Sequence, residues 1–230
     1  MTTIVGIKCS DGIVIGADTQ KTLDAYFYSY KELNYKKIFR IKNDILFAGA
    51  GNVTYIEKIK EALSERYDNK KNQLNIPETF EKIFKFVYEN YPIDKPFQLI
   101  FGCKNSKKEL NLYQIHSQCN IAEKIDHFYT IGTGNFFARY IINNFLDLDL
   151  SIVDAVSLIC YVLDEVCKID LNSGTPINIA YLKSCGISFV EKEKITKIIT
   201  KINDYLPSLN KYITKFFKEK IFKANGIDSL

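Results

Sequence analysis

The first eighteen residues, MTTIVGIKCSDGIVIGAD, decide the fold of this chain. Residues 2–9 and 12–18 are short runs rich in β-branched residues, which favour the pleated surface of a strand. Ser10, Asp11 and Gly12 at their junction have the composition of a turn. The stretch therefore predicts a β-hairpin that starts at the N-terminus.

Runs of strands and runs of helices follow one another along the rest of the chain. The expected elements are, in order, a hairpin at 38–41 and 45–48, two helices opening at Asn52 and Pro77, strands at 97–103, 110–116 and 127–132, two helices opening at Gly134 and Ser151, and strands at 177–183 and 186–190. Segregated runs favour an α+β domain with antiparallel sheets between helix pairs over a parallel βαβ fold.

Composition places the chain among globular proteins and excludes several classes. Its 230 residues are 47% hydrophobic and 25% charged, enough to bury the core of one domain. A net charge of +4 gives no reason to expect nucleic acid as a partner. No segment has the apolar length of a membrane span or the pattern of a signal peptide, so we expect a cytoplasmic protein without membrane contact.

No cofactor or metal is expected from the motifs. Neither a dinucleotide fingerprint nor a phosphate-binding lysine loop occurs, and His116 and His127 lack neighbouring metal ligands, so both are interpreted as structural or solvent-facing. The cysteines form no C-x-x-C pair, so we expect reduced thiols rather than a zinc site or a disulfide framework. They are Cys9, Cys103, Cys119, Cys160, Cys167 and Cys185.

The chain ends in a lysine-rich amphipathic segment from Glu191 to about Asn225, in which apolar residues recur at helical spacing and Pro207 is expected to restart the helix. We therefore divide the chain into a domain at 1–190 and a helical extension at 191–230. The lysines make a membrane surface or nucleic acid conceivable partners. The broad apolar stripe favours packing against its own domain or a neighbouring subunit instead.

Thr2 is the candidate for chemistry. A threonine hydroxyl is a poor nucleophile until a base takes its proton, and a free α-amine on the same residue is one way to supply that base. Thr2 gains a free amine once Met1 is removed, because a small second residue permits that removal, and no propeptide is then needed. With Met1 attached the amine is an amide, so the base exists only after processing.

Several short motifs accompany this threonine. They are Thr2-Thr3-Ile-Val-Gly-Ile, Gly16-Ala17-Asp18, Lys37, Ala48-Gly49-Ala50-Gly51, Gly132-Thr133-Gly134 and Asp170-x-x-Ser173-Gly174. Together, over residues 2–190, they resemble the proteasome β-subunit and HslV peptidase family. The separations from Lys37 to Ser173 are those of the family, whereas a tyrosine-rich stretch between Asp18 and Lys37 is a few residues longer. The resemblance implies a four-layer αββα sandwich of the N-terminal-nucleophile hydrolase type.

The resemblance also implies roles for individual residues. The match of Lys37 lies beside the nucleophile, where a cation disfavours protonation of the α-amine, and the match of Asp18 pairs with that lysine. The match of Gly51 donates its backbone N–H to the oxyanion of the tetrahedral intermediate. Asp170 and Ser173, with Thr133, match residues that orient the α-amine and its water.

Two positions depart from the family pattern. Thr133 stands where serine is usual, which keeps a hydroxyl, and Thr175 stands where a second glycine is frequent. Gln20 is similar to HslV, whereas the Asp170-to-Gly174 motif is similar to the proteasome β-subunit and smaller bacterial β-type homologues. The subfamily therefore stays open.

A pocket for the residue before the cleaved bond is predicted behind Gly49. Val53 and Glu57 lie four residues apart and share one helix face there, and Gly49 leaves room for a side chain. Glu57 favours a basic side chain, unless Lys21 and the inserted tyrosine-rich loop cover or neutralise the pocket.

Three functions remain open at this point. The favoured one is a threonine-type endopeptidase acting on peptides or unfolded proteins. The resemblance implies that it works in a self-compartmentalising homo-oligomeric ring, together with an ATP-dependent unfoldase. The same chemistry suits an amidase or a transpeptidase with a dedicated substrate. A non-catalytic ring or scaffold subunit is the third, although the complete set Thr2, Asp18, Lys37 and Ser173 speaks against it.

Overall fold

A computed structural model describes residues 2–25, 28–66, 76–91, 96–105, 107–119, 121–145 and 149–216. The chain forms two compact units, Met1–Glu191 and Lys192–Leu230. The predicted α+β class with a four-layer αββα sandwich is correct for the first unit.

One antiparallel sheet contains the predicted N-terminal hairpin. Its order is β10-β1-β2-β11-β12. Gly6 lies opposite Ile15 within the hairpin, and Asp18, the last residue of β2, lies opposite Ile177 of β11. The strands are β1 (Thr3–Cys9), β2 (Gly12–Asp18), β10 (Phe128–Gly132), β11 (Ile177–Lys183) and β12 (Gly186–Phe189). This register brings the end of β2 beside the start of β1, where Thr2 lies.

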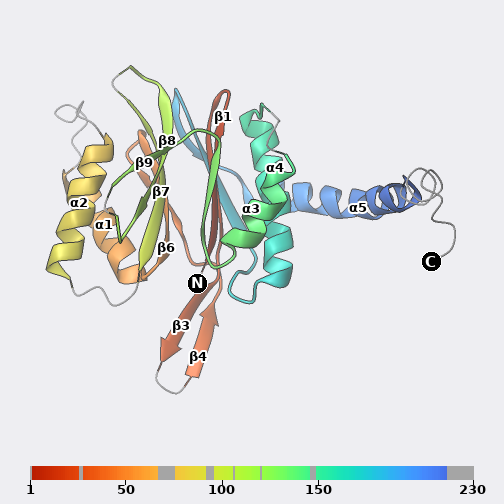
Figure 1. Cartoon of the computed structure of the whole chain (residues 1–230), viewed down its shortest axis with the longest axis horizontal. Coiled ribbons are helices and arrows are strands. Elements are labelled where there is room, and N and C mark those ends of the chain that lie inside the picture. Colours follow the sequence, from red (N-terminus) through yellow and green to blue (C-terminus); the bar gives the residue numbers. More distant parts are fainter. Residues whose placement is uncertain are drawn as a thin grey trace, which may run out of the picture. The chain divides into compact units, whose positions relative to one another are not determined.

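The second antiparallel sheet has the order β5-β6-β7-β8-β9. Its strands are β5 (Ile38–Ile41), β6 (Ile45–Gly51), β7 (Phe97–Lys104), β8 (Leu110–His116) and β9 (Glu123–Ile125). A separate two-stranded hairpin, β3 (Lys21–Ala25) and β4 (Tyr28–Glu32), links the two sheets in sequence and projects from the sandwich in Figure 1.

Two helix pairs form the outer layers. Helices α1 (Val53–Arg66) and α2 (Ile76–Asn90) lie outside the second sheet, and α3 (Asn135–Asn143) and α4 (Ile152–Ile169) lie outside the first (Figure 1). Three of these helices begin as the sequence predicts: α1 after Asn52, α3 after Gly134 and α4 after Ser151. The Asn52 side chain accepts the backbone N–H of Thr54 at 3.0 Å, and Ser151 forms a capping box with Asp154.

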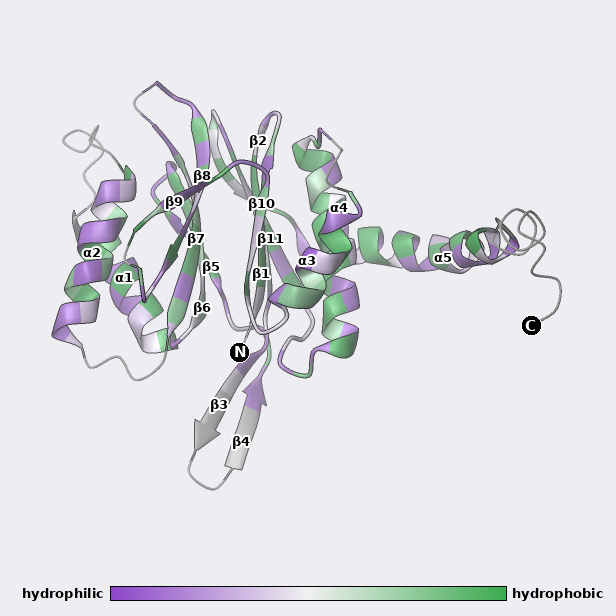
Figure 2. Ribbon diagram, viewed as in Figure 1, coloured by the Kyte–Doolittle hydropathy of each residue, from purple (hydrophilic) through white to green (hydrophobic). Residues whose placement is uncertain are grey.

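Burial on both faces explains why residues 4–7 and 13–17 of the first hairpin are apolar runs without polar alternation. Alternate residues such as Ile4 and Ile15 pack between the two sheets, while Gly16 on the opposite face lies directly under Ile159 of α4. A second core, centred on Phe47, Phe80 and Phe101, fills the space between the second sheet and its helices. Helix α2 accordingly alternates hydrophobic and hydrophilic residues along its length in Figure 2.

The second unit is described by helix α5 (Lys192–Phe216), which continues through Pro207, so the expected restart there is wrong. Tyr205, Leu209 and Tyr212 on this helix are exposed. Leu146, predicted to extend the third helix, and residues 217–230 of the predicted extension lie outside the described residues. None of the helices within the described ranges combines the length and apolar character needed to cross a bilayer.

Candidate active site

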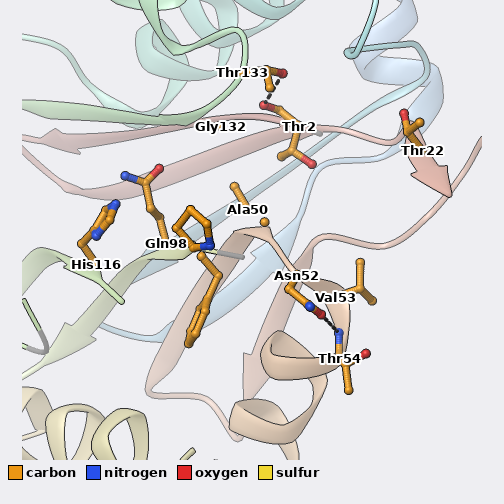
Figure 3. Close-up of a pocket in the computed structure, with 13 residues that line it drawn as sticks. Thr2, Thr22, Ala50, Asn52, Val53, Thr54, Gln98, His116, Gly132 and Thr133 are labelled. Atoms are coloured by element: carbon orange, nitrogen blue, oxygen red, sulfur yellow. Dashed lines mark hydrogen bonds between the residues drawn. The ribbon is translucent and has the colours of Figure 1, made fainter. Parts of the chain in front are cut away.

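Thr2 lies just before β1 and is 5% exposed. The Thr133 hydroxyl lies 3.4 Å from its carbonyl oxygen. Gly132 passes so close that a Cβ there would stand 1.9 Å from the same oxygen, and its φ of +91° is also one that glycine adopts readily. In Figure 3, Thr2 lies between Thr133 and Ala50 at the edge of a cavity of about 590 Å3.

Asp18 is the centre of a buried polar cluster beside Thr2. Its Oδ1 accepts hydrogen bonds from Lys37 Nζ at 2.7 Å and from the backbone N–H of Thr3 at 2.8 Å. Its Oδ2 accepts the backbone N–H groups of Gln20 and Gly174 at 3.0 and 3.2 Å. Four donors therefore satisfy a carboxylate that is 0% exposed, as a buried charge requires.

Lys37 forms the predicted ion pair with Asp18, and its side chain is 3% exposed. Burial lowers the pKa of Lys37 below its ordinary value, and the attraction of Asp18 opposes that shift. The ammonium contributes to the wall of a small cavity that Thr2 also lines. A cation held at this place disfavours a second positive charge nearby.

A chain of hydroxyl groups joins the start of β1 to Asp170. Ser173 Oγ donates to Asp170 Oδ2 at 2.7 Å, and Thr3 Oγ1 lies 2.6 Å from Ser173 Oγ. The hydrogen of Ser173 is committed to the carboxylate, so Thr3 is the donor in the second bond. Thr133 Oγ1 also donates to Asp170 Oδ2, at 3.0 Å. The predicted residues Thr133, Asp170 and Ser173 thus form one network adjoining Thr2.

Gly51 ends β6 and lines the large cavity, as Thr133 does. Its φ is +110°, and a Cβ at this position would lie 2.5 Å from the carbonyl oxygen of Pro96. Glycine is therefore required by both the backbone conformation and the close approach of β7. Because Gly51 has no side chain, a molecule in the cavity can approach the backbone at this end of β6.

A small side pocket of about 40 Å3 opens next to Thr2, Gly51 and Val53. Three of the four residues predicted for substrate binding, Gly49, Val53 and Lys21, contribute to its wall. Glu57 does not. Its carboxylate instead accepts the Tyr35 hydroxyl at 3.2 Å and pairs with Lys60 at 2.6 Å, and it is Tyr35 that lines the pocket.

Sequence reasoning missed several residues of this region. Thr3, Gln20 and Gly174 were named above but were given no role; they donate backbone N–H groups to Asp18, which every residue type except proline can do, so their identity gives no signal for these bonds. His116, interpreted above as structural or solvent-facing, lines the large cavity together with Gln98. Its Nδ1 accepts the backbone N–H of Gln118 at 3.1 Å.

Comparison with known proteins identifies the family that the arrangement around Thr2 also indicates. A sequence profile for the family described as "Proteasome subunit" matches residues 1–182. The proteasome subunit beta of Nanoarchaeum equitans is 28% identical over 200 residues, which cover 84% of this chain and 100% of the relative.

Two further relatives give similar matches. Proteasome subunit beta 1 of Thermococcus sibiricus is 26% identical over 205 residues, covering 87% of this chain and 96% of the relative. The probable proteasome subunit beta type-2 of Encephalitozoon cuniculi is 26% identical over 195 residues, covering 82% of each chain. The similarity therefore extends over most of the length of these relatives.

Proposed function

The chain belongs to the proteasome subunit family, and from that membership and the geometry around Thr2 we propose that it is a threonine-type endopeptidase. Removal of Met1 frees the α-amine of Thr2. The Thr2 hydroxyl is then the nucleophile, and the amine of the same residue is its base. No cofactor or metal takes part in the proposed reaction.

The reaction has two steps. In the first, the amine takes the proton of Thr2 Oγ1 as that oxygen attacks the peptide carbonyl, and the proton passes to the departing amine as the C–N bond breaks. This leaves an ester between Thr2 and the acyl part of the substrate. In the second step, the amine takes a proton from a water molecule as the water oxygen attacks the ester carbonyl; the ester C–O bond then breaks, the acid product leaves, and the proton returns to Thr2 Oγ1.

Neighbouring groups support both steps. The backbone N–H of Gly51 donates to the oxyanion of each tetrahedral intermediate, where a fixed donor stabilises charge as it develops. The network of Thr133, Ser173 and Asp170 orients the amine and the attacking water. Lys37 keeps the amine neutral near neutral pH, because its own charge opposes protonation of the amine, and Asp18 holds Lys37 in position.

The observation that carries this proposal is the buried Lys37–Asp18 pair next to Thr2. Removing each of these two charges from water costs about 5 kcal/mol of desolvation free energy. A merely structural buried pair can often be replaced by well-packed apolar residues of similar volume without loss of stability. A chain that keeps the charges in the wall of a cavity lined by its N-terminal threonine has a chemical use for them.

The test compares Thr2→Ala with Thr2→Ser. Peptide cleavage measured with fluorogenic substrates is expected to vanish in Thr2→Ala and to persist at a reduced rate in Thr2→Ser, which keeps the hydroxyl and the amine. Unchanged cleavage by Thr2→Ala refutes the proposal. Product analysis with a competing amine separates hydrolysis from a dedicated transpeptidase, and activity on a single amide alone identifies an amidase. A protein inactive in every assay is a non-catalytic ring or scaffold subunit.

We also propose a homo-oligomeric ring, supplied with unfolded protein by an ATP-dependent unfoldase in the cytoplasm. Phe136 and Tyr140 stand one turn apart on α3 and are 79% and 74% exposed, an apolar surface of the kind that subunit contacts cover. All six cysteines are free thiols, in keeping with a reducing compartment. Tyr205, Leu209 and Tyr212 of α5 are also exposed, and we expect a neighbouring subunit, rather than the domain of the same chain, to cover them.

Mass measurement in solution tests the assembly. Light scattering coupled to size-exclusion chromatography is expected to give a multimer, and Phe136→Glu is expected to reduce its size. A truncation after Val190 is expected to shrink the assembly or lose solubility. A soluble truncated protein of unchanged oligomeric size contradicts the role given to the extension.

A further inference from the structure

The side pocket next to Thr2 is small. Its volume of about 40 Å3 compares with the roughly 10–15 Å3 of probe-occupied space that a single water molecule needs. It therefore accommodates a side chain of a few heavy atoms. A phenylalanine, leucine or arginine side chain needs more space than the pocket has.

Tyr35 closes this pocket, and three contacts hold it in place. Its backbone N–H donates to the carbonyl oxygen of Thr19 at 2.9 Å. Lys21 Nζ lies 4.6 Å from the centre of its ring, a cation–π contact. Its hydroxyl donates to Glu57 Oε1 at 3.2 Å. Tyr35 lies between β4 and β5, in the tyrosine-rich stretch that precedes Lys37, so this stretch supplies a wall of the pocket.

The same tyrosine separates Glu57 from the pocket. Tyr35 lines the cavity and Glu57 does not, while the Tyr35 hydroxyl and Lys60 both engage the Glu57 carboxylate. Burial, followed by the charge of Glu57, raises the pKa of Tyr35 above its ordinary value, so the ring stays neutral. The face presented to a substrate is therefore an uncharged aromatic ring.

The two lysines of the pocket wall have acidic partners. Lys37 pairs with Asp18 at 2.7 Å, and Lys21 lies 3.5 Å from Glu32. Because each cation has a carboxylate of its own, the pocket gives an acidic side chain little net attraction. Size and neutrality, rather than charge, are then the properties that the pocket selects.

We propose that Tyr35 determines the selectivity of the peptidase, restricting the residue before the cleaved bond to small neutral side chains such as alanine, serine, threonine or valine. This inference rests on the peptidase function proposed above. It replaces the basic preference that Glu57 alone would give, because the tyrosine stands where a long basic side chain would have to pass.

The experiment uses the full chain and fluorogenic peptides that differ only in the residue before the cleaved bond: Ala, Val, Leu, Phe, Asp and Arg. The wild-type protein is expected to cleave after Ala and Val with a kcat/KM about 10- to 100-fold above that for Phe and Arg, the discrimination that a size-limited pocket provides. Tyr35→Ala is expected to raise cleavage after Leu and Arg by a similar factor of about 10 or more.

Two further variants separate size from charge. Tyr35→Phe keeps the ring and is expected to keep the wild-type order of substrates. Adding Glu57→Gln to Tyr35→Ala is expected to remove the gain for Arg while leaving the gain for Leu, because only the basic side chain uses the carboxylate. Tyr35→Leu, which shortens the side chain but preserves its apolar packing, serves if Tyr35→Ala does not fold.

The results of these assays test the selectivity proposal and the peptidase function separately. Cleavage that depends on Thr2, but has the same order of substrates in wild type and in Tyr35→Ala or Tyr35→Leu, overturns the selectivity proposal alone. A wild-type preference for Phe or Arg overturns it as well. Absence of cleavage for all peptides and all variants refutes the peptidase function, and the selectivity proposal with it.

Discussion

Two carboxylates near the small pocket beside Thr2 each pair with a lysine, yet the two pairs differ in burial. The side chains of Asp18 and Lys37 are 0% and 3% exposed, whereas those of Glu57 and Lys60 are 34% and 39% exposed. Asp18 also accepts three backbone N–H groups, while Glu57 accepts the hydroxyl of Tyr35. The two pairs have nearly equal N–O distances, 2.7 and 2.6 Å.

Burial, not distance, makes these two pairs different. Water screens Glu57 and Lys60, so either partner tolerates loss of the other. Removing one partner of the buried pair leaves a charge without compensation in a medium of low polarity. We infer that the pair of Asp18 and Lys37 is needed for the proposed catalysis. The contacts of Glu57 affect which substrates are selected, and they can be altered without loss of catalysis.

The largest effect is expected for Lys37→Met. Removing this ammonium leaves Asp18 buried without its cation, and the free energy of unfolding is expected to fall by about 3–5 kcal/mol, with loss of peptide cleavage. Lys60→Met is the matched control on the other carboxylate and is expected to cost less than about 1 kcal/mol. Urea denaturation measures both, and equal losses for the two variants contradict the comparison.

A double variant sharpens this prediction. Asp18→Asn combined with Lys37→Met removes both buried charges, and is expected to recover part of the stability lost in Lys37→Met but none of the cleavage activity. Recovery of cleavage in the double variant would show that the charges serve only the fold.

The next largest effect is expected for Gly51→Ala. Its φ of +110° and the 2.5 Å approach of a Cβ to the Pro96 carbonyl oxygen place strain on rigid backbone. The expected loss in unfolding free energy is about 1–3 kcal/mol, with a fall in kcat/KM as the proposed oxyanion donor shifts. At Gly49 a Cβ would meet only the Ile56 side chain at 2.8 Å, so Gly49→Ala is expected to destabilise less. The reverse order of destabilisation in thermal unfolding refutes this.

The pH dependence of cleavage reports on Lys37 directly. On the acid side, activity is expected to rise as the α-amine of Thr2, with a reference pKa of about 7.7–8.0, loses its proton. On the alkaline side, it is expected to fall by up to about tenfold per pH unit, beginning below the ordinary lysine value because burial lowers the pKa of Lys37. A profile of kcat/KM that stays flat to the ordinary lysine pKa contradicts this assignment.

As pH rises on the alkaline side, the contribution of Lys37 to stability is expected to increase, whereas activity is expected to fall. Between the lowered pKa of Lys37 in the folded protein and its ordinary value, the unfolded chain binds the proton more tightly. The contribution of Lys37 to the free energy of unfolding therefore rises with pH through this window. Subtracting the pH dependence of Lys37→Met from that of the wild type isolates it.

The smallest effect is expected for Tyr35→Phe, which removes one half-buried hydrogen bond to Glu57. The unfolding free energy is expected to fall by about 0.5–1.5 kcal/mol, the usual net value of one hydrogen bond. Chemical denaturation measures this. A loss as large as that of Lys37→Met would show that the Glu57 cluster holds the fold together as much as the Asp18 cluster does.

Most of the fold could be predicted, because most elements combine a clear apolar pattern with a turn or cap residue at their ends. The hairpin at residues 2–18 combines β-branched runs with a turn signal, and the cap at Ser151 precedes a long apolar helix. The hairpin of β3 and β4 was missed because residues 21–32 contain no glycine, proline or asparagine to mark a turn. Strand β9 spans only Glu123–Ile125, too short for a periodic signal.

The residues of the candidate site also fall into those that the sequence predicts and those that it does not. Asp18, Lys37, Asp170 and Ser173 were found because their spacing resembles a known family, and the structure brings them together beside Thr2. The tyrosine-rich stretch was expected to cover or neutralise the pocket, but Tyr35 was not singled out, because several tyrosines occur in that stretch and nothing in the sequence distinguishes the one that lines the pocket. The position of Glu57 outside the pocket depends on that tyrosine, so spacing along α1 alone could not reveal it.

The central claim is that Thr2, with a free amine, is the nucleophile. An epoxyketone tests both features together, because a stable adduct requires a hydroxyl that attacks its ketone and an adjacent amine that opens its epoxide. Intact mass and peptide mapping of protein expressed in cells are expected to show a chain without Met1 that gains one adduct, located on Thr2. A chain that keeps Met1 and takes up no label, or that is labelled at another residue, contradicts the claim.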